Sequence, residues 1–323
     1  MTQAWTLGEL LIDFVSTESG VSVGQAPAFE KAPGGAPANV AVGLARLGIA
    51  SGFLGKVGDD EFGHFLAQTL EANGVDISGL RYSDQARTML AFVSVAADGE
   101  RSFMFYRHPS ADMLLHPDDI DREAIGAARL LHHGSISLIS EPSRSATLAA
   151  IAAAHEQGLW VSYDPNLRLN LWPSTEAARQ GLLSAWHSAD VIKVSRDELA
   201  FLSGEKDWIR GAETLWHDRL RLLVITAGPQ GCHYVTRGAR GDHARGHVPT
   251  YDVPVVDTTG AGDGFVAGLL AGLLENEGAW DDVDALQEVL RLANAVGALT
   301  TTQRGAIPAL PSRERVSALL EQR

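Results

Sequence analysis

The most informative stretch of the sequence is Asp257-Thr258-Thr259-Gly260-Ala261-Gly262-Asp263-Gly264-Phe265. A β-branched run at residues 253–256 precedes it and predicts a strand, and an apolar run at residues 265–274 follows it and predicts a helix. The small residues between them therefore lead into a helix N-terminus, where unpaired amides and the helix dipole bind anions. Asp263 adds a carboxylate, which can take a proton from a hydroxyl while the amides hold the phosphoryl group that the hydroxyl attacks.

Two other interpretations of this loop compete with catalysis. An Asp in the first turn of a helix is commonly a cap, and Gly-rich turns are common. A nicotinamide-binding loop also joins a strand to a helix, but its G-x-G-x-x-G spacing requires Gly where Phe265 stands. Asp263 would also repel a pyrophosphate. The loop alone therefore leaves catalysis and capping equally open, and it disfavours an oxidoreductase.

The composition is that of a large acidic globular protein. Among 323 residues, 26 Lys and Arg face 40 Asp and Glu, so the net charge is −14. This charge argues against nucleic acid or an anionic membrane as a partner. An anionic ligand such as a nucleotide would need a local site and a metal ion. One cysteine, Cys232, excludes an internal disulfide, and no signal peptide or membrane-spanning run is predicted, so we expect a cytoplasmic protein.

Apolar runs of strand length alternate with helical patterns along the chain. Strands are predicted at residues 7–15, 50–55, 129–134, 159–164, 190–194 and 221–226, with a hairpin at 231–250. Helices are predicted at residues 38–47, 61–73, 118–127, 142–157, 174–187, 196–216, 261–276 and 282–302. This alternation predicts a single α/β domain over residues 1–323, a three-layer α/β/α sandwich with a mostly parallel central sheet.

Two segments break this rhythm. Residues 15–32 and 87–112 both contain two-strand material, and the second has a strong turn signal at Asp98-Gly99. We expect these segments to form a small β-sheet lid that is attached to the sandwich.

A second glycine-rich stretch is Pro33-Gly34-Gly35-Ala36-Pro37-Ala38-Asn39. Paired glycines let a ligand approach the backbone closely. Asn39 would lie one turn into the following helix, where its amide can donate to and accept from a sugar hydroxyl. A plain Gly-rich turn before a helix explains the same residues, and the stretch taken alone favours that simpler interpretation.

Polar residues also follow several predicted strands, and ligands of parallel sheets gather at these carboxyl ends. Asp13 could accept hydrogen bonds from a sugar there, or form a turn. Asp164 and Asn166 offer oxygen ligands to hydrated Mg²⁺, and a Pro-Asn turn is the structural alternative for them. The Arg168 guanidinium suits a phosphate in transit, which the turn does not explain.

Two further loops follow predicted strands. Ser195 and Glu198 have the spacing of a capping box, and a metal-linked role for Glu198 competes evenly with that interpretation. The loop at residues 225–231 suits the phosphates or ribose of a nucleotide. Jointly these loops bring acids, an arginine and glycine turns to one edge of one sheet. A kinase needs this combination, because it requires a base, an amide cradle and a neutralised nucleotide.

On two motifs the chain resembles the PfkB-type (ribokinase-family) carbohydrate kinases over nearly its whole length. The motifs are Gly34-Gly35-Ala36-Pro37-Ala38-Asn39 and Asp257-Thr258-Thr259-Gly260-Ala261-Gly262-Asp263. Within the family, residues 8–14, 105–114 and 163–168 are most similar to fructokinases. The resemblance implies ATP-dependent phosphorylation of D-fructose to D-fructose 6-phosphate. 2-Keto-3-deoxygluconate kinase, aminoimidazole riboside kinase and ribokinase stay open, as does a non-catalytic sugar- or nucleotide-sensing protein, against which the retained Asp263 speaks.

The resemblance also implies individual roles. Asp263 would be the base, the amides of Gly260, Ala261 and Gly262 the anion hole, and Arg168 a contact of both sugar and transferred phosphate. Sugar contacts would be Asp13, Gly34, Gly35, Asn39, Tyr106 and Arg107, and nucleotide contacts Lys193, Thr226, Gly228, Gly231 and Asn294. Asp164, Asn166 and Glu198 would contact Mg²⁺ through water, and Asp257, Thr259, Thr301, Arg304 and Gly305 would hold K⁺. Ser195 stands where many members of the family have Asn. The resemblance also implies a homodimer that forms through the lid.

Overall fold

The computed structural model describes residues 1–95, 101–238 and 243–322. Its central sheet has nine strands in the order β13-β12-β11-β10-β9-β8-β1-β4-β5. Neighbouring strands from β11 to β5 are parallel, whereas β12 and β13 extend the sheet as an antiparallel hairpin. The strands are β1 (Ala4–Leu7), β4 (Ser51–Gly58), β5 (Leu80–Ser83), β8 (Leu130–His133), β9 (Trp160–Tyr163), β10 (Val191–Ser195), β11 (Leu222–Thr226), β12 (Cys232–Arg237) and β13 (His243–Val248).

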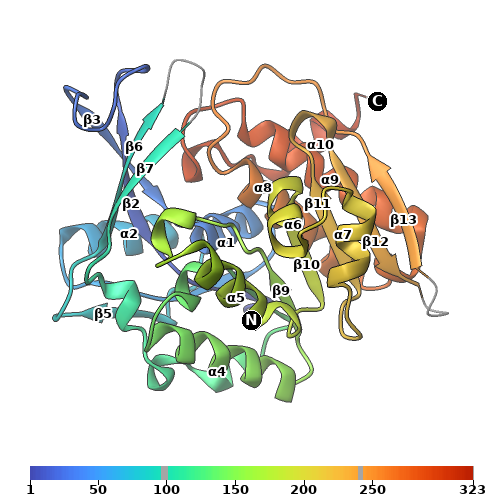
Figure 1. Ribbon diagram of the computed structural model, residues 1–323, viewed down its shortest axis with the longest axis horizontal. Coiled ribbons are helices and arrows are strands. Elements are labelled where there is room, and N and C mark those ends of the chain that lie inside the picture. Colours follow the sequence, from blue (N-terminus) through green and yellow to red (C-terminus); the bar gives the residue numbers. More distant parts are fainter. Residues whose placement is uncertain (96–100, 239–242, 323) are drawn as a thin grey trace.

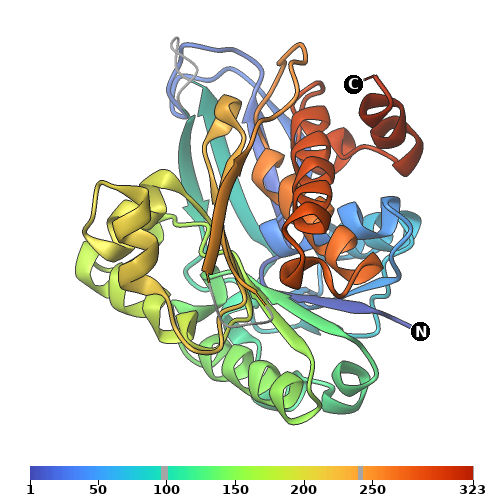
Figure 2. The same ribbon diagram turned by 90° about the vertical axis from the view of Figure 1, so that its right-hand side faces the viewer.

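Helices cover both faces of this sheet, as Figure 2 shows from the side. One layer contains α1 (Ala36–Arg46), α2 (Glu61–Ala72), α8 (Ala261–Glu275), α9 (Val283–Thr300) and α10 (Arg313–Leu320). The other contains α3 (Arg122–Gly126), α4 (Ser143–Glu156), α5 (Thr175–Trp186), α6 (Arg196–Ser203) and α7 (Trp208–Leu215). The predicted three-layer α/β/α sandwich is confirmed.

The buried strand β11 illustrates why the sheet requires both layers. Successive side chains of a strand point to opposite faces. Leu223 and Ile225 pack in the cluster with α4 to α7, whereas Leu222 and Val224 pack in the cluster with α8 and α9. A strand that is apolar at every position is therefore stable only between two helical layers.

A second, four-stranded sheet lies beside the sandwich, at the upper left of Figure 1. We call it the small sheet. Its strands, in the order β3-β2-β6-β7, are β2 (Leu11–Ser16), β3 (Phe29–Gly34), β6 (Met89–Val95) and β7 (Arg101–Tyr106). The β2 and β6 strands pair parallel, and the two outer pairs are antiparallel. A small sheet is thus present. Its β3, β6 and β7 strands fall mainly within the expected segments 15–32 and 87–112, whereas most of β2 lies before residue 15. The predicted turn at residues 98–99 lies outside the described residues.

The strand predicted at residues 7–15 is wrong as one element. The chain leaves the central sheet after Leu7 and enters the small sheet at Leu11. Gly8 has a φ of 155°, and a Cβ atom there would lie 2.6 Å from Cγ of Pro37, so only glycine fits this break. Asp13 consequently lies within the small sheet rather than at the end of the first central strand.

The strand predicted at residues 253–256 is also wrong. These residues form no strand, and the side chains of Val255 and Val256 are 64% and 59% exposed. The Val256 amide instead donates to the Thr301 carbonyl (2.8 Å), which attaches the segment to the end of α9. Two predicted helices are likewise divided: residues 117–119 form a 3₁₀ turn before α3, and Gly204 in a left-handed conformation separates α6 from α7.

Candidate active site

A cavity of about 330 Å³ lies where the small sheet meets the carboxyl ends of the central strands and the start of α8. Its volume is in the range of small-molecule sites. Ten of the predicted site residues line it: Asp13, Gly35, Asn39, Asn166, Arg168, Lys193, Thr259, Gly260, Gly262 and Asp263. The fold therefore brings the predicted base, sugar contacts and phosphate contacts into one cavity.

The loop before α8 has the form expected of an anion site. Gly260 precedes the helix with a φ of 74°, and a Cβ atom there would lie 2.8 Å from Cβ of Ala306. No side chain caps the helix, but the Ala261 amide donates to the Thr258 carbonyl at 3.3 Å, so the amides of Gly260 and Gly262 are the ones left for a ligand. Asp263 does not act as the cap either, which removes the structural interpretation of this carboxylate.

Asp263 instead binds the other glycine-rich motif of the chain. Its Oδ2 accepts a hydrogen bond of 2.7 Å from Nδ2 of Asn39, in the first turns of α1. Burial in the cavity raises the pKa of Asp263, and the Asn39 hydrogen bond and the charges of Lys193 and Arg168 oppose that increase. A raised pKa makes the carboxylate a stronger base than an exposed aspartate.

The glycine pair before α1 allows close approach. A Cβ atom on Gly34 would lie 2.3 Å from Oδ2 of Asp13, and one on Gly35, which has a φ of 113°, would lie 2.3 Å from the Glu9 carbonyl oxygen. Both glycines are therefore required by packing. Gly35 also lines the cavity, so its backbone is open to a ligand.

The small sheet contributes aromatic rings to the cavity. Phe103 and Phe105 are two positions apart in β7, so both rings lie on the side of the strand that faces the cavity, with ring centroids 5.9 Å apart. The Arg168 guanidinium lies 5.6 Å from the Phe103 ring centroid. Tyr106 points to the opposite side, where it is 59% exposed and contacts Phe92. The structure therefore places Phe103 and Phe105, rather than Tyr106, in the cavity.

Arg107 is buried just beyond β7. Its Nε donates to Oδ2 of Asp112 at 2.8 Å, and its Nη2 donates to the Ile136 carbonyl at 3.0 Å. Both bonds hold the turn after β7 against the sandwich. The guanidinium is thus engaged with protein groups, and Arg107 is not among the residues that line the cavity.

Lys193 and Asp164 form a buried ion pair at the base of the cavity, with Nζ 3.0 Å from Oδ2. Burial raises the pKa of Asp164 to about 6, although Lys193 lowers it. Burial works against the charged form of Lys193, but Asp164 and Glu198 outweigh it and raise the Lys193 pKa. The Lys193 Nζ atom would lie 3.3 Å from a Cβ atom on Gly262. The ammonium group therefore faces the loop at residues 257–263 before α8, which we call the anion loop.

Glu198 forms the capping box with Ser195. Its Oε2 accepts from the Ser195 amide (2.7 Å), and the Ser195 hydroxyl accepts from the Glu198 amide (3.1 Å). The second carboxylate oxygen accepts from the Leu167 amide at 2.7 Å. Burial opposes ionisation of Glu198, but Lys193 and these amides outweigh it and lower its pKa. Glu198 is thus an anion that fixes the loop carrying Arg168.

The predicted cation residues also come together. Asp257 accepts hydrogen bonds from the amide and hydroxyl of Thr259 (2.9 and 2.7 Å) and from the Gly305 amide (2.9 Å). The Asp257 amide donates to the Thr301 carbonyl at 3.1 Å. Arg304 is exposed beside them. This network joins the anion loop to the segment after α9.

The predicted nucleotide residues surround the ends of β11 to β13. Thr226 ends β11, and Gly228 and Gly231 both have positive φ in the following turn. The Asn294 side chain is buried, and its Nδ2 donates to the Val248 carbonyl at 3.2 Å. None of these four lines the 330 Å³ cavity, whereas Lys193 does.

The comparisons agree with this geometry. The family model described as pfkB family carbohydrate kinase matches residues 1–313. The chain belongs to this family. A probable fructokinase-4 of Arabidopsis thaliana is 55% identical over 317 residues, covering 98% of this chain and 96% of that protein.

Solved structures of the family are similar throughout. A fructokinase from Xylella fastidiosa with bound ATP has a TM-score of 0.90 and 36% identity, covering 100% of this chain and 99% of that one. A double mutant of the fructokinase from Vibrio cholerae O395, with fructose, ADP and potassium ion bound, has a TM-score of 0.88 and 38% identity, covering 99% and 98%. The ribokinase-like α/β fold expected from the sequence is thereby confirmed.

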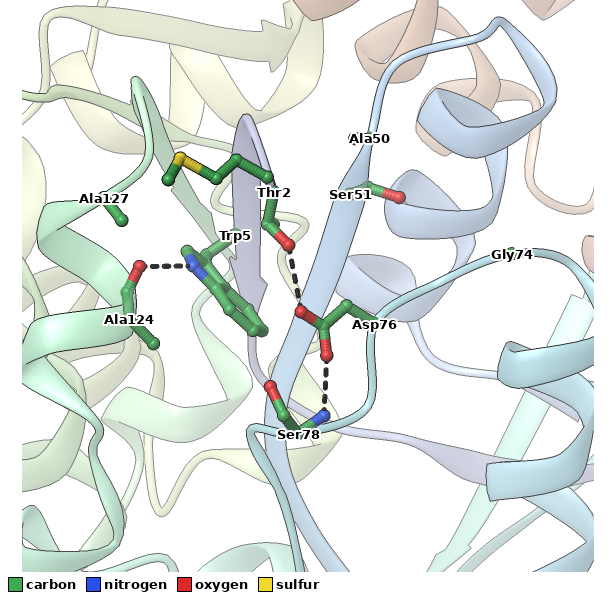
Figure 3. A pocket seen from close by; sticks show the side chains of 10 residues that line it. Thr2, Trp5, Ala50, Ser51, Gly74, Asp76, Ser78, Ala124 and Ala127 are labelled. Carbon is green, nitrogen blue, oxygen red and sulfur yellow. Dashed lines mark hydrogen bonds between the residues drawn. The ribbon is translucent and has the colours of Figure 1, made fainter.

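This pfkB-family chain has a second cavity, of about 430 Å³, at the amino ends of β1 and β4 (Figure 3). There the Thr2 hydroxyl and the Ser78 amide both donate to Asp76, and the Trp5 indole donates to the Ala124 carbonyl. Its polar groups thus bond one another, and it lies at the end of the parallel strands opposite to the anion loop. We do not assign it to the kinase site.

Sequence reasoning missed part of the cavity wall in this carbohydrate kinase. The additional lining residues are Glu9, Leu11, Ala36, Phe103, Phe105, Ile136 and Thr258. The period of two in the strand at residues 101–106 separates Phe103 and Phe105 from Tyr106, and Glu9 is an acid within an apolar run. The period of two shows that these two rings lie on the same side of the strand, but not that this side faces the cavity. Ile136 carried no signal, because a single apolar residue after a strand is common.

Proposed function

We propose that this carbohydrate kinase transfers the γ-phosphoryl group of ATP to fructose, forming fructose 6-phosphate and ADP. The observation that carries the proposal is the contact of Asp263 with Asn39 at the uncapped start of α8, inside a cavity of small-molecule size. Its relatives named fructokinase, at up to 55% identity, and the fructose and ADP bound to one of them support the substrate.

In the proposed reaction, the attacking sugar hydroxyl lies against Asp263, which accepts its proton. Asn39 fixes the orientation of the carboxylate, because its Nδ2 binds one of the two oxygens. The amides at the start of α8 and the charges of Lys193 and Arg168 stabilise the transferred phosphoryl group. Phe103 and Phe105 cover the cavity and exclude water that would otherwise compete with the sugar.

Magnesium bound to the nucleotide would neutralise phosphate charge. Asp164 and Glu198 fit a contact with such an ion through water. Their oxygens already accept hydrogen bonds from the chain, and each keeps a further lone pair for a metal-bound water. Asn166, which follows Asp164 with a φ of 42°, lines the cavity and can supply an additional oxygen. Among the described residues, no three His, Cys, Asp or Glu side chains are grouped as direct ligands.

We also propose a monovalent cation, K⁺, beside the anion loop. The carbonyl oxygens near Thr301, Arg304 and Gly305 and the oxygens of Asp257 and Thr259 would hold it. The support is the network that joins these residues, together with the potassium ion of the Vibrio cholerae fructokinase structure. Oxygen ligands of this kind suit a hard cation.

For the nucleotide, we propose contacts with Lys193, Thr226, Gly228, Gly231 and Asn294. Lys193 faces the anion loop from β10, and the turn after β11 provides backbone with positive φ that can follow a phosphate closely. Asn294 positions the neighbouring end of β13 through the Val248 carbonyl. ATP bound to the Xylella fastidiosa fructokinase supports ATP as the donor.

The proposed partners are small molecules and a second copy of the chain. Tyr106 and Met104 are 59% and 41% exposed on the outer side of the small sheet, next to Phe92, which makes an apolar patch for a homodimer. A Tyr106→Glu variant is expected to elute later than wild type in size-exclusion chromatography. An unchanged elution volume would remove this interface.

We propose a cytoplasmic location and no nucleic acid or membrane partner. Among the described residues, no helix is long and apolar enough to cross a membrane.

The test of the proposed function is ADP release with ATP and a panel of sugars. The panel contains fructose, glucose, mannose, ribose, 2-keto-3-deoxygluconate and aminoimidazole riboside. We expect fructose to give the highest kcat/KM. A higher value for the keto acid or a riboside would move the proposal to those kinases, and no turnover with any sugar would favour a non-catalytic sensor.

A further inference from the structure

Glu9 is a buried acid in the wall of the cavity to which the proposed reaction gives no role. It lies in the break between β1 and β2, and its side chain is 3% exposed. Its Oε1 accepts a hydrogen bond of 3.0 Å from the Ala36 amide at the start of α1. Its Oε2 is buried and has no hydrogen-bond partner among the described residues. Half of the carboxyl group therefore caps a helix, and the other half lacks a partner.

The surroundings of Glu9 disfavour a negative charge. Asp112 and Asp263 both act on it, and Asp13 lines the same cavity. The nearby cation Arg107 is engaged by Asp112 and the Ile136 carbonyl. Burial is the main cause that raises the pKa of Glu9 to about 7. Hydrogen bonds from backbone amides, including that of Ala36, oppose this rise, and the two aspartates add to it. A neutral Glu9 carries a proton, and the oxygen without a partner is the one that can hold it.

A second unpartnered oxygen belongs to the same cavity. Asn39 donates through Nδ2 to Asp263, but its Oδ1 is buried without a partner among the described residues. Oδ1 and Nδ2 belong to the same amide group, so Oδ1 lies close to the Asp263 carboxylate. In the proposed reaction the attacking hydroxyl lies against this carboxylate. A sugar hydroxyl is both donor and acceptor. It can therefore donate a hydrogen bond to Asn39 Oδ1 and accept one from Oε2 of Glu9.

We propose that Glu9 is a further sugar-binding residue of this kinase. As a neutral acid, Glu9 donates a hydrogen bond from Oε2 to a substrate hydroxyl, and the same hydroxyl donates a hydrogen bond to Oδ1 of Asn39. The inference rests on the proposed function, because it assumes that a sugar occupies the cavity. It narrows the substrate class to polyols with a second hydroxyl close to the one that is phosphorylated. A neutral residue here also avoids placing another anion beside the incoming phosphoryl group.

The test compares wild type with Glu9→Gln over the pH range 6 to 8. In wild type, the KM for sugar is expected to rise about tenfold over this range, because the ionised acid has no proton to donate. Glutamine keeps an oxygen for the Ala36 amide and an N–H donor that does not ionise. Its sugar KM should stay within about threefold of the wild-type value at pH 6 and lose most of the rise. The KM for ATP should not change. Glu30→Gln, at an exposed glutamate of β3, is the matched control.

Two outcomes would overturn the inference. A sugar KM of the glutamine variant that is tenfold higher than wild type already at pH 6 would mean that the carboxylate itself, or a structural role, is required. A variant that keeps the wild-type pH dependence would mean that another group titrates. Failure of the proposed function looks different, because wild type would then turn over no sugar. The infrared difference spectrum of wild type minus Glu9→Gln at pH 6 measures the charge state of Glu9 without turnover, because it cancels bands of other protonated acids such as Asp164. Absence of a carboxylic-acid band from this difference would also overturn the inference.

Discussion

The side-chain amide of Asn39 lies 2.7 Å from the carboxylate of Asp263, although 224 positions separate the two residues in the chain. The contact depends on close packing of α1 against α8. A Cβ atom on Gly43 would lie 2.5 Å from Cβ of Ala267, so only glycine permits this approach. The two glycine-rich motifs of the sequence therefore form one site because of a helix contact that lies outside both motifs.

Replacing Asp263 by Asn should lower kcat at least ~100-fold, since general-base catalysis contributes roughly 10²–10⁴-fold. This corresponds to about 2.7 kcal/mol of transition-state free energy. Asparagine keeps the size of the side chain but cannot accept the proton. Sugar binding, measured by calorimetry, should weaken much less, because Asp13 and Asn39 remain. Asp252→Asn, at an exposed position before the loop, should have normal turnover. Near-normal turnover of Asp263→Asn would refute the mechanism.

Lys193→Met should both destabilise and inactivate the protein. It leaves Asp164 buried without its cation, and an uncompensated buried charge costs roughly 3–5 kcal/mol. The double variant Lys193→Met, Asp164→Asn should recover much of the free energy of unfolding, measured with urea, but not kcat. Recovery of both would show that Lys193 has a structural role only. Recovery of neither would mean that the pair is not the source of the effect.

Potassium should activate the enzyme. Asp257 is bonded to Thr259 and Gly305, so a cation held here would fix the loop that carries the anion-binding amides. Replacing K⁺ by tetramethylammonium at constant ionic strength should lower kcat in wild type. In Asp257→Ala, kcat should be low with either cation. Equal rates of wild type in both salts would exclude the cation site.

Closure of the small sheet over the sugar is testable at Asn170. Its Nδ2 donates to the Phe103 carbonyl at 3.0 Å, which connects the loop after β9 to β7. One hydrogen bond contributes about 1 kcal/mol, so Asn170→Ala should raise the sugar KM about fivefold and leave the ATP KM unchanged. Asn276→Ala, exposed at the end of α8, is the control. Equal increases in both KM values would argue against a lid.

The charge state of Glu9 predicts a pH-dependent stability difference that needs no substrate. Its pKa changes from the ordinary value of 4.5 to about 7 in the folded protein. Between these pH values the unfolded chain loses a proton that the folded chain keeps, so stability falls as pH rises and then levels off above 7. Relative to Glu9→Gln, the wild-type free energy of unfolding should therefore fall by on the order of 3 kcal/mol from pH 4.5 to 8. A constant difference in urea titrations would contradict the raised pKa.

The layers and the loop before α8 were predictable because their signals are local. Alternating apolar runs predict the sandwich, and a glycine turn followed by an apolar helix predicts an uncapped helix N-terminus. The strand at residues 7–15 was mispredicted because the sequence does not show that Gly8 meets Pro37, a contact made only in the folded chain. The valines at 253–256 have strand propensity but no neighbouring strand to pair with.

The cavity residues that the small sheet contributes were harder to predict than those that the sandwich contributes. Asp263 begins a helix and Arg168 follows a strand, and at such places the position in the chain implies the direction of the side chain. Tyr106 and Phe105 are adjacent, and only the pairing of β7 with β6 decides which of them faces the cavity. Register is a long-range property, so it could not be read from residues 101–106 alone.

The hydrogen bonds to Thr301 make the position of the loop before α8 depend on the lengths of α8 and α9. The segment that leads into α8 meets the end of α9, because the Thr301 carbonyl accepts hydrogen bonds from the amides of Val256 and Asp257. Removing one residue inside either helix would shift that carbonyl by about 1.5 Å and rotate it by about 100°. We therefore expect the loop before α8 to tolerate length changes in the connection at residues 276–282, at the far end of the pair, but not within the helices.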